Sequence, residues 1–149
     1  MSSVQTRSLF DVAAEITAAL QRVAFEIAGL QITPYMNANP SPPSIDVYPD
    51  DPFQTGAGFG ETNEAGRWVP DSRIGFVIRA RVGTADAEAS QRLLYRMLDP
   101  RDPANVEAAI ADTEAPVVPD GVSGFRPYVE DVGENGTLIG VEWRVATYL

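Results

Sequence analysis

Residues 74–100, IGFVIRARVGTADAEASQRLLYRMLDP, change their hydrophobic period within a few positions. Up to Val82, apolar side chains alternate with glycine, valine or arginine, which is typical of a strand with one face toward a core. Beyond Thr84, which can cap a helix, the apolar residues recur at helical spacing instead. This stretch therefore predicts a strand followed at once by a helix that packs on the same core.

The rest of the chain predicts further elements of both kinds. Residues 8–28 carry one apolar stripe at helical spacing, with Ser8 and Asp11 suited to a capping box and Gly29 to a left-handed helix end. Two short strands, QITPY and SIDVYP, follow, and a short helix is predicted after Asp102 and Pro103.

The chain closes with two predicted strands, SGFRPYVEDV and TLIGVEWRVATYL, joined at Asn135-Gly136 by a hairpin turn. In the last strand, Trp143 and its alternate neighbours face the core. Helices and strands in this order predict an α+β fold, in which a single domain of residues 1–149 has a mixed or antiparallel sheet covered by helices on one face.

Residues 50–73, DDPFQTGAGFGETNEAGRWVPDSR, predict a long loop without regular structure. Its glycines do not match a nucleotide-binding loop, because the spacing is GxGxG and no lysine follows. Two interpretations remain: a flexible loop, or a segment that becomes ordered on a partner. The second would use Phe53, Phe59 and Trp68 as anchors, since aromatic side chains are enriched in interfaces.

The composition excludes most kinds of catalytic site. The chain has no histidine and no cysteine, so catalytic triads, thiolate nucleophiles and histidine-containing zinc sites cannot form within it. Carboxylates gather at 46–51, 99–102 and 130–131, but those before proline are typical of turns and helix caps, and none matches a calcium-binding loop. We therefore predict that the protein is not an enzyme and binds no cofactor or metal.

The charge and hydropathy limit the partners. The formal net charge is -10, and all 11 basic residues are arginine. An acidic domain repels phosphate backbones, so direct sequence-specific binding of nucleic acid is not expected. The N-terminus lacks the apolar core of a signal peptide, and no apolar run approaches a membrane span, so we expect synthesis in the cytoplasm and no membrane contact.

The strand pattern also predicts a charged sheet face that points away from the core. Its members are Arg79, Arg81, Glu142 and Arg144. One interpretation is a solvated face with exposed ion pairs, each worth roughly 0–1 kcal/mol. The other is an interface, because the planar guanidinium group pairs well with carboxylates of a neighbouring molecule. The residues alone leave both interpretations open.

Three stretches resemble those of a known family: GLQITPYMNANPSPPSIDVYP after the first helix, FVIRARVG followed by TADAEASQRLLYRMLDP, and the closing LIGVEWRVATYL. Together they resemble the tail-terminator, or tail-completion, proteins of long-tailed bacteriophages, especially phages of actinobacteria. The likeness runs from about residue 10 to the C-terminus, and residues 50–73 carry no mark of the family.

The resemblance implies a structural virion protein at the head-proximal end of the tail. Such proteins form a homo-oligomeric, hexameric ring on the last ring of the tail-tube protein, stop its polymerisation and present a surface to the neck or head-completion protein. A ring requires two different complementary patches on each subunit. Two alternatives remain: a head–tail connector of the same machine, or a small cytoplasmic module that binds a ligand.

Overall fold

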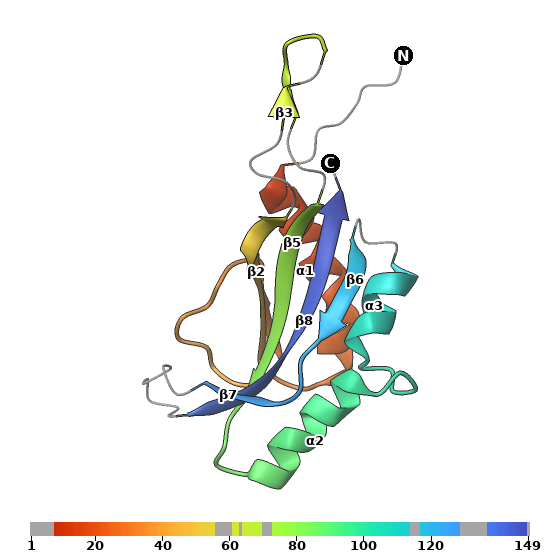
Figure 1. Cartoon of the computed structure of the whole chain (residues 1–149). Coiled ribbons are helices and arrows are strands. Elements are labelled where there is room, and N and C mark those ends of the chain that lie inside the picture. Colours follow the sequence, from red (N-terminus) through yellow and green to blue (C-terminus); the bar gives the residue numbers. More distant parts are fainter. Residues whose placement is uncertain are drawn as a thin grey trace.

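The computed structural model describes residues 8–55, 61–62, 64–69, 73–113, 117–128 and 137–148. Within these residues the chain forms three helices, one six-stranded sheet and a separate two-stranded ladder (Figure 1). In chain order the elements are α1 (Leu9–Glu26), β1 (Gln31–Thr33), β2 (Ser44–Thr55), β3 (Glu61–Thr62), β4 (Trp68–Val69), β5 (Arg73–Val82), α2 (Ala87–Leu98), α3 (Val106–Asp112), β6 (Val118–Val122), β7 (Arg126–Tyr128) and β8 (Leu138–Tyr148).

The sheet is mixed, as the sequence predicts. Its strand order is β1-β2-β5-β8-β6, and β7 also pairs with β8. The short β1 runs parallel to β2 at one edge, whereas β2, β5 and β8 are antiparallel neighbours. At the other edge, β6 pairs with the second half of β8 and β7 with its beginning. The chain therefore has the α+β fold that its pattern of elements indicates.

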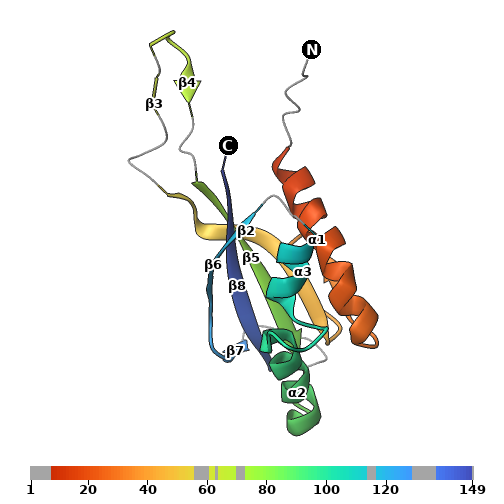
Figure 2. The same ribbon diagram turned by 90° about the vertical axis from the view of Figure 1, so that its right-hand side faces the viewer.

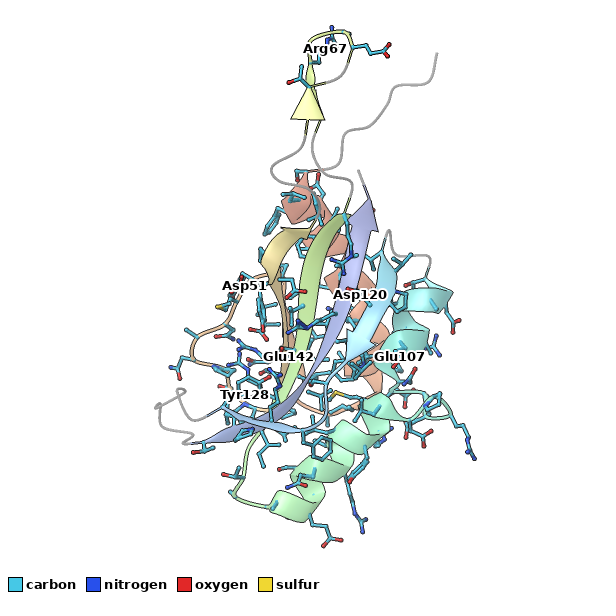
Figure 3. The ribbon with its side chains drawn as sticks, in the orientation of Figure 1. Asp51, Arg67, Glu107, Asp120, Tyr128 and Glu142 are labelled. Carbon is cyan, nitrogen blue, oxygen red and sulfur yellow. The ribbon has the colours of Figure 1, made fainter. Side chains whose placement is uncertain are left out.

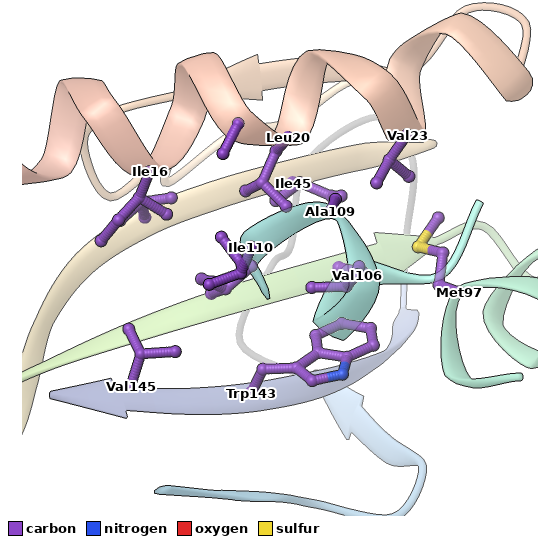
Figure 4. Packing of buried hydrophobic residues seen from close by; sticks show 14 of the residues in the cluster. Ile16, Leu20, Val23, Ile45, Met97, Val106, Ala109, Ile110, Trp143 and Val145 are labelled. Atoms are coloured by element: carbon purple, nitrogen blue, oxygen red, sulfur yellow. The ribbon is translucent and has the colours of Figure 1, made fainter. Parts of the chain in front are cut away.

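The three helices lie on one face of the sheet (Figure 2). Figure 4 shows side chains of α1 and α3 packing against β2 and β8. At the centre, Ile16 and Leu20 of α1, Ile78 of β5 and Trp143 of β8 are buried, and alternate residues of β5 from Ile74 to Val82 all belong to this core. The predicted core face of β5 is confirmed because alternate side chains of a strand point to one side.

The start of α1 has the predicted capping box. The Ser8 hydroxyl accepts a hydrogen bond from the Asp11 amide at 3.0 Å, and an Asp11 carboxylate oxygen accepts one from the Ser8 amide at 3.2 Å. Gly29 follows the helix with φ 77°, the left-handed conformation expected of it. The start of α1 is therefore set by residues that the sequence identifies, whereas its C-cap is Ile27 and Gly29 forms the turn after it.

The predicted caps of α2 and α3 are wrong. Asp86, not Thr84, caps α2 through the Ala89 amide, while the Thr84 hydroxyl donates to the Thr137 carbonyl oxygen. Asn105, not Asp102, caps α3 and also donates to the Met97 carbonyl oxygen. In both places another polar residue lies closer to the helix start, and sequence spacing alone does not choose between neighbouring caps.

The prediction of a loop without regular structure at 50–73 is wrong for the described part of that segment. β2 continues to Thr55, β5 begins at Arg73, and β3 pairs with β4 between them. Gly66, with φ 76°, lies between β3 and β4. Strands of two residues are too short to show an alternating pattern, so no sequence signal marks them. We call β3, β4 and residues 64–67 the arm.

The closing hairpin is confirmed in its strands, because Tyr128 of β7 faces Leu138 of β8 in an antiparallel register. Asn135 and Gly136, the predicted turn, lie outside the described residues. β6 was not predicted, since Pro119 and Gly121 interrupt its pattern and its register shifts between Pro119 and Val122. None of the described helices has the length and apolar character needed to cross a membrane.

Candidate interaction surface

Asp46 is at the centre of a charge cluster on the sheet face opposite the helices. One carboxylate oxygen accepts from the Arg79 Nε at 3.1 Å, and the other accepts from the Arg79 guanidinium at 2.7 Å. The Arg81 guanidinium donates to the second oxygen at 3.2 Å. The Asp46 side chain is 1% exposed and that of Arg81 0%, so these charges are removed from water and compensate one another inside the subunit.

The same cluster fixes the segment between β1 and β2 on the sheet. The Asn37 amide donates to Asp46 at 2.9 Å, and the Asn37 carbonyl oxygen accepts from Arg81 at 2.6 Å. Further along this segment, Pro40 is buried and Pro42 lies beside Gly83. One peptide unit is thus held through both its donor and its acceptor, which orders a segment rich in proline and asparagine.

Glu142 forms the second half of the cluster. Its carboxylate accepts from the Tyr128 hydroxyl at 2.5 Å and lies 3.6 Å from Arg126 and 3.5 Å from Arg144. Arg144 also lies 3.5 Å from Asp50. Figure 3 shows Tyr128 and Glu142 together on the sheet. Glu142 is buried, whereas the Arg144 side chain is 40% exposed, so the cluster reaches the surface at Arg144.

Two tyrosine rings enclose Arg79. Its guanidinium carbon lies 4.8 Å from the centre of the Tyr48 ring and 5.3 Å from that of Tyr128. Burial, followed by the nearby charge of Glu142, raises the pKa of Tyr48 to about 12, although Arg79 opposes the shift. Burial also raises the pKa of Tyr128, and its hydrogen bond to Glu142 adds to this because the bond requires the phenol proton.

Within the subunit, the first of the two interpretations, a solvated face, fails for three of the four residues, because Arg81 and Glu142 are buried and the Arg79 side chain is 12% exposed. The second interpretation, an interface, stays a prediction. Strand alternation places all of them on the side away from the helices, and the structure agrees. However, Asn37 and Tyr128, from other segments of the chain, contact these side chains. Alternation indicates which way a side chain points, but it does not show which distant segment folds over it. Only Arg144 keeps substantial exposure for an outside contact.

Of the three aromatic anchors predicted in residues 50–73, the structure describes the backbone of two and the side chain of none. Phe59 lies outside the described residues. The backbone of Phe53 belongs to β2 and that of Trp68 to β4, and their side chains lie outside the described part. Trp68 faces Thr62 in the ladder, so it belongs to the arm.

A second surface, an apolar groove, was missed by the sequence interpretation. It lies between the first turns of α1 and the middle of β2, has a volume of about 180 Å³, and is lined by Leu9, Phe10, Ala13, Val47, Pro49 and Phe76 among others. Phe10 is 62% exposed at its rim. Helical periodicity assigns Leu9 to the apolar stripe of α1 but does not show that a groove stays open between this part of the helix and the sheet.

Two of the acidic residues considered for metal binding, Asp46 and Asp102, already accept hydrogen bonds from groups of the same subunit. Asp46 accepts from two arginines, and Asp102 accepts from the Ala104 amide and from Arg96. These bonds, the amide first, lower the pKa of Asp102. Within the described ranges, no three acidic residues gather in a way that could hold a metal ion, and residues 130–131 lie outside those ranges.

The charge cluster and the apolar groove differ in what they can contribute to binding a partner. The carboxylates of the cluster are engaged by cations and amides of the same subunit, so the cluster stiffens the sheet and holds its covering segments. The groove offers apolar area with no charged side chain among its lining residues, which suits an apolar or aromatic side chain of a partner.

Comparison of the sequence with models of known protein families gives no match, and comparison with curated proteins gives no significant similarity. The functional interpretation therefore rests on the sequence resemblance, the fold and these two surfaces.

Proposed function

We propose that the protein is the tail terminator of a long-tailed bacteriophage. Copies of the chain assemble into a hexameric ring that caps the tail tube, ends its polymerisation and joins the neck. The protein is synthesised in the host cytoplasm and resides in the virion at the head-proximal end of the tail. Its partners are further copies of itself, the tail-tube protein and a neck or head-completion protein.

The positions of the resembling stretches support this proposal. The first stretch contains β1 and the start of β2, the second contains most of β5 and all of α2, and the third contains all of β8. β2, β5 and β8 are the central strands of the sheet. The likeness therefore covers the framework of the domain and not only scattered surface segments.

The arm is the observation that carries the assembly role. In Figures 1 and 2, β3 and β4 lie beyond the end of the six-stranded sheet, and their described pairing is with each other. The described side chains of the arm, at residues 62 and 64–67, are exposed. A hairpin of two short strands alone is marginally stable in water, so contact with another molecule would stabilise it.

The charge cluster fits the same role. A ring closes only if each subunit holds its two contact surfaces at a fixed angle. Asp46 connects β2 to Arg79 and Arg81 of β5, and Glu142 extends these contacts to β8 and β7. The cluster thereby fixes the strands whose ends carry the arm. A role that depends on surface complementarity requires neither a general base nor a nucleophile, so we propose no enzymatic activity.

The test is the growth of tail tubes from the purified tail-tube protein of the same phage, measured by electron microscopy with and without this protein. The proposal predicts a ring at one end of each tube and arrest of growth at that end. Tubes that lengthen equally in both samples contradict it. A protein that binds the head side of the neck without affecting tube growth is the head–tail connector instead.

A further inference from the structure

The charge cluster presents its cations to solvent and keeps its carboxylates inside. The Arg126 side chain is 54% exposed and that of Arg144 is 40% exposed. Their partners, Asp50 and Glu142, have side chains that are each 9% exposed, and the Asp46 side chain is 1% exposed. A molecule that approaches this face of the sheet therefore meets guanidinium groups before it meets any acid of the cluster.

The cluster also contains one cation in excess, whereas the whole chain has a formal net charge of -10. The side chains joined by its ion pairs are four arginines and three acids: Arg79, Arg81, Arg126, Arg144, Asp46, Asp50 and Glu142. With the arginines outermost, this face is a local region of positive potential on an acidic molecule. Such a region attracts carboxylates of a partner.

The two exposed arginines retain donors for such a partner. Arg126 and Arg144 lie at opposite oxygens of the Glu142 carboxylate, at 3.6 Å and 3.5 Å. These distances are long for hydrogen bonds, and the same carboxylate accepts a shorter one, of 2.5 Å, from Tyr128. A guanidinium group has five N–H donors in a planar fork, so each arginine can also bind a carboxylate from outside.

The base of this site is held in place by aromatic side chains. The rings of Tyr48 and Tyr128 enclose Arg79, and Tyr128 also donates to Glu142 beside it (Figure 3). Tyrosine and arginine are among the residues most enriched at the energetic centres of protein interfaces. Because these groups are already ordered in the subunit, binding a partner here costs little further ordering of the base.

We propose that Arg126 and Arg144 bind an acidic segment of a different protein, with one carboxylate on each guanidinium group. Acidic residues at alternate positions of an extended segment point to the same side and lie about 6.6 Å apart. Two such carboxylates can lie on either side of Glu142, as the two arginines do. The inference rests on the proposed function in placing that protein in the phage tail, although the site is complete in one subunit.

The net charge disfavours two other sources of anionic groups. A nucleic acid carries a charge at every nucleotide, so a chain with a net charge of -10 repels it as a whole. A second copy is repelled in the same way, and acids on its helices are already paired, Asp112 with Arg22 and Glu88 with Arg92. A different protein can present two carboxylates without carrying a large negative charge.

An NMR titration of the isotopically labelled protein with a blocked GEGEG peptide tests the site. We expect shifts of the backbone amides of β7 and of residues 142–144, and a Kd about tenfold lower than that of a GQGQG peptide, which lacks both ion pairs. Duplex DNA at the same concentration should leave these amides unshifted. Equal binding of the two peptides, or equal shifts with DNA, would overturn the inference, since neither fits recognition of carboxylates on a protein segment.

Substitutions identify the binding groups. Arg126→Gln should weaken GEGEG binding about threefold, the effect of losing one exposed ion pair, and the double variant with Arg144→Gln about tenfold. Arg92→Gln is the matched control, because Arg92 is 75% exposed and also pairs with one acid, so the affinity should not change. Arg126→Gln should leave the unfolding temperature unchanged, since that arginine is exposed, which separates loss of binding from loss of folding. Unchanged affinity in the double variant contradicts the inference.

The outcomes separate this inference from the proposed function. If the GEGEG peptide binds as expected but the protein does not arrest tail tubes, the site stands and the proposed function fails. If the protein caps tubes but the peptide does not bind, the proposed function stands and the site is wrong. If the double variant loses the native mass of the unmodified assembly, the acidic segment belongs to a second copy, and its assignment to a different protein is wrong.

Discussion

Asp46 is the residue on which the internal organisation of the charged face most depends. It compensates two guanidinium groups and fixes the Asn37 peptide, all with almost no exposure to solvent. Buried ion pairs are weak evidence for net stabilisation, but removing one partner leaves an uncompensated charge in the interior. The sequence shows Asp46 only as an acid near the start of a strand.

Asp46→Asn should lower the free energy of unfolding by about 3–5 kcal/mol, because Arg79 and Arg81 would both lose their buried counter-charge. Chemical denaturation measures the change. The matched control is Glu88→Gln, which removes an exposed ion pair with Arg92 and should change stability by less than about 0.5 kcal/mol. Equal effects of the two substitutions would show that the cluster does not depend on Asp46.

The raised pKa of Tyr48 predicts that the protein loses stability at alkaline pH. Burial raises the pKa of Tyr48 from its ordinary value of 10.0 to about 12 in the folded protein, so above pH 10 the unfolded chain releases a proton that the folded chain retains. The stabilising effect of the neutral phenol is complete below pH 10 and is lost as pH rises toward 12. Tyr128, whose pKa is also raised, acts in the same direction.

Thermal unfolding between pH 9 and about 12 measures this effect, with Tyr48→Phe as the comparison. The variant cannot lose that proton, so its stability should fall less steeply than that of the unmodified protein over this range. Parallel curves for the two proteins would mean that Tyr48 ionises in the folded state as readily as in the unfolded chain.

At the scale of elements, the attachment of β7 to β8 depends on one glycine. A Cβ atom at Gly140 would lie 2.3 Å from the Ala80 carbonyl oxygen and 2.8 Å from the Tyr128 ring. The absence of a side chain there allows Tyr128 to reach Glu142 and Arg79. These contacts add to the pairing of the three residues of β7 with β8 and to the contact of Arg126 with Glu142.

Gly140→Ala should destabilise the protein by about 1–3 kcal/mol, the usual cost of adding a methyl group to a filled site. The expected fall in unfolding temperature is on the order of 2–4 °C per kcal/mol for a chain of this size. Gly124→Ala is the control, because no atom lies within 4 Å of its added Cβ. If Gly140→Ala unfolds at the same temperature as the control, the close approach is not rigid.

The sequence predicts the elements with long periodic patterns and misses those formed by distant contacts. α1, β5 and β8 follow from alternation or helical spacing, because their buried side chains determine their pattern. β6 and the arm have no such signal, since short strands with proline or glycine are defined by pairing with another segment. Element type was therefore predictable where burial is periodic.

The charged face illustrates the same limit at the candidate site. Arg81 has the sequence position of an outward-facing residue and yet no exposed side chain. Its guanidinium group donates to the Asn37 carbonyl oxygen, 44 positions away in the chain, and to Asp46 on the neighbouring strand. Local pattern identifies the face, whereas its cover depends on tertiary contacts that no spacing in the sequence expresses.

At the scale of the whole molecule, the net charge of -10 opposes assembly. Like-charged copies repel over a distance of about 10 Å at 0.1 M ionic strength and about 3 Å at 1 M. Contacts made by apolar groups are not weakened by this screening. We therefore expect the ring to be more populated at 0.5 M than at 0.05 M sodium chloride, measured by light scattering after size-exclusion chromatography; the opposite trend would indicate contacts dominated by ion pairs.

The central claim is that the chain assembles through two different surfaces into a closed ring, and its native mass tests this most directly. Native mass spectrometry of the unmodified protein, at high concentration or released from tail tubes, should give a single closed species of six chains without larger open polymers. A protein that remains a monomer under these conditions, or that forms only a two-fold symmetric dimer, would contradict the account, because neither closes a ring through two different surfaces of each subunit.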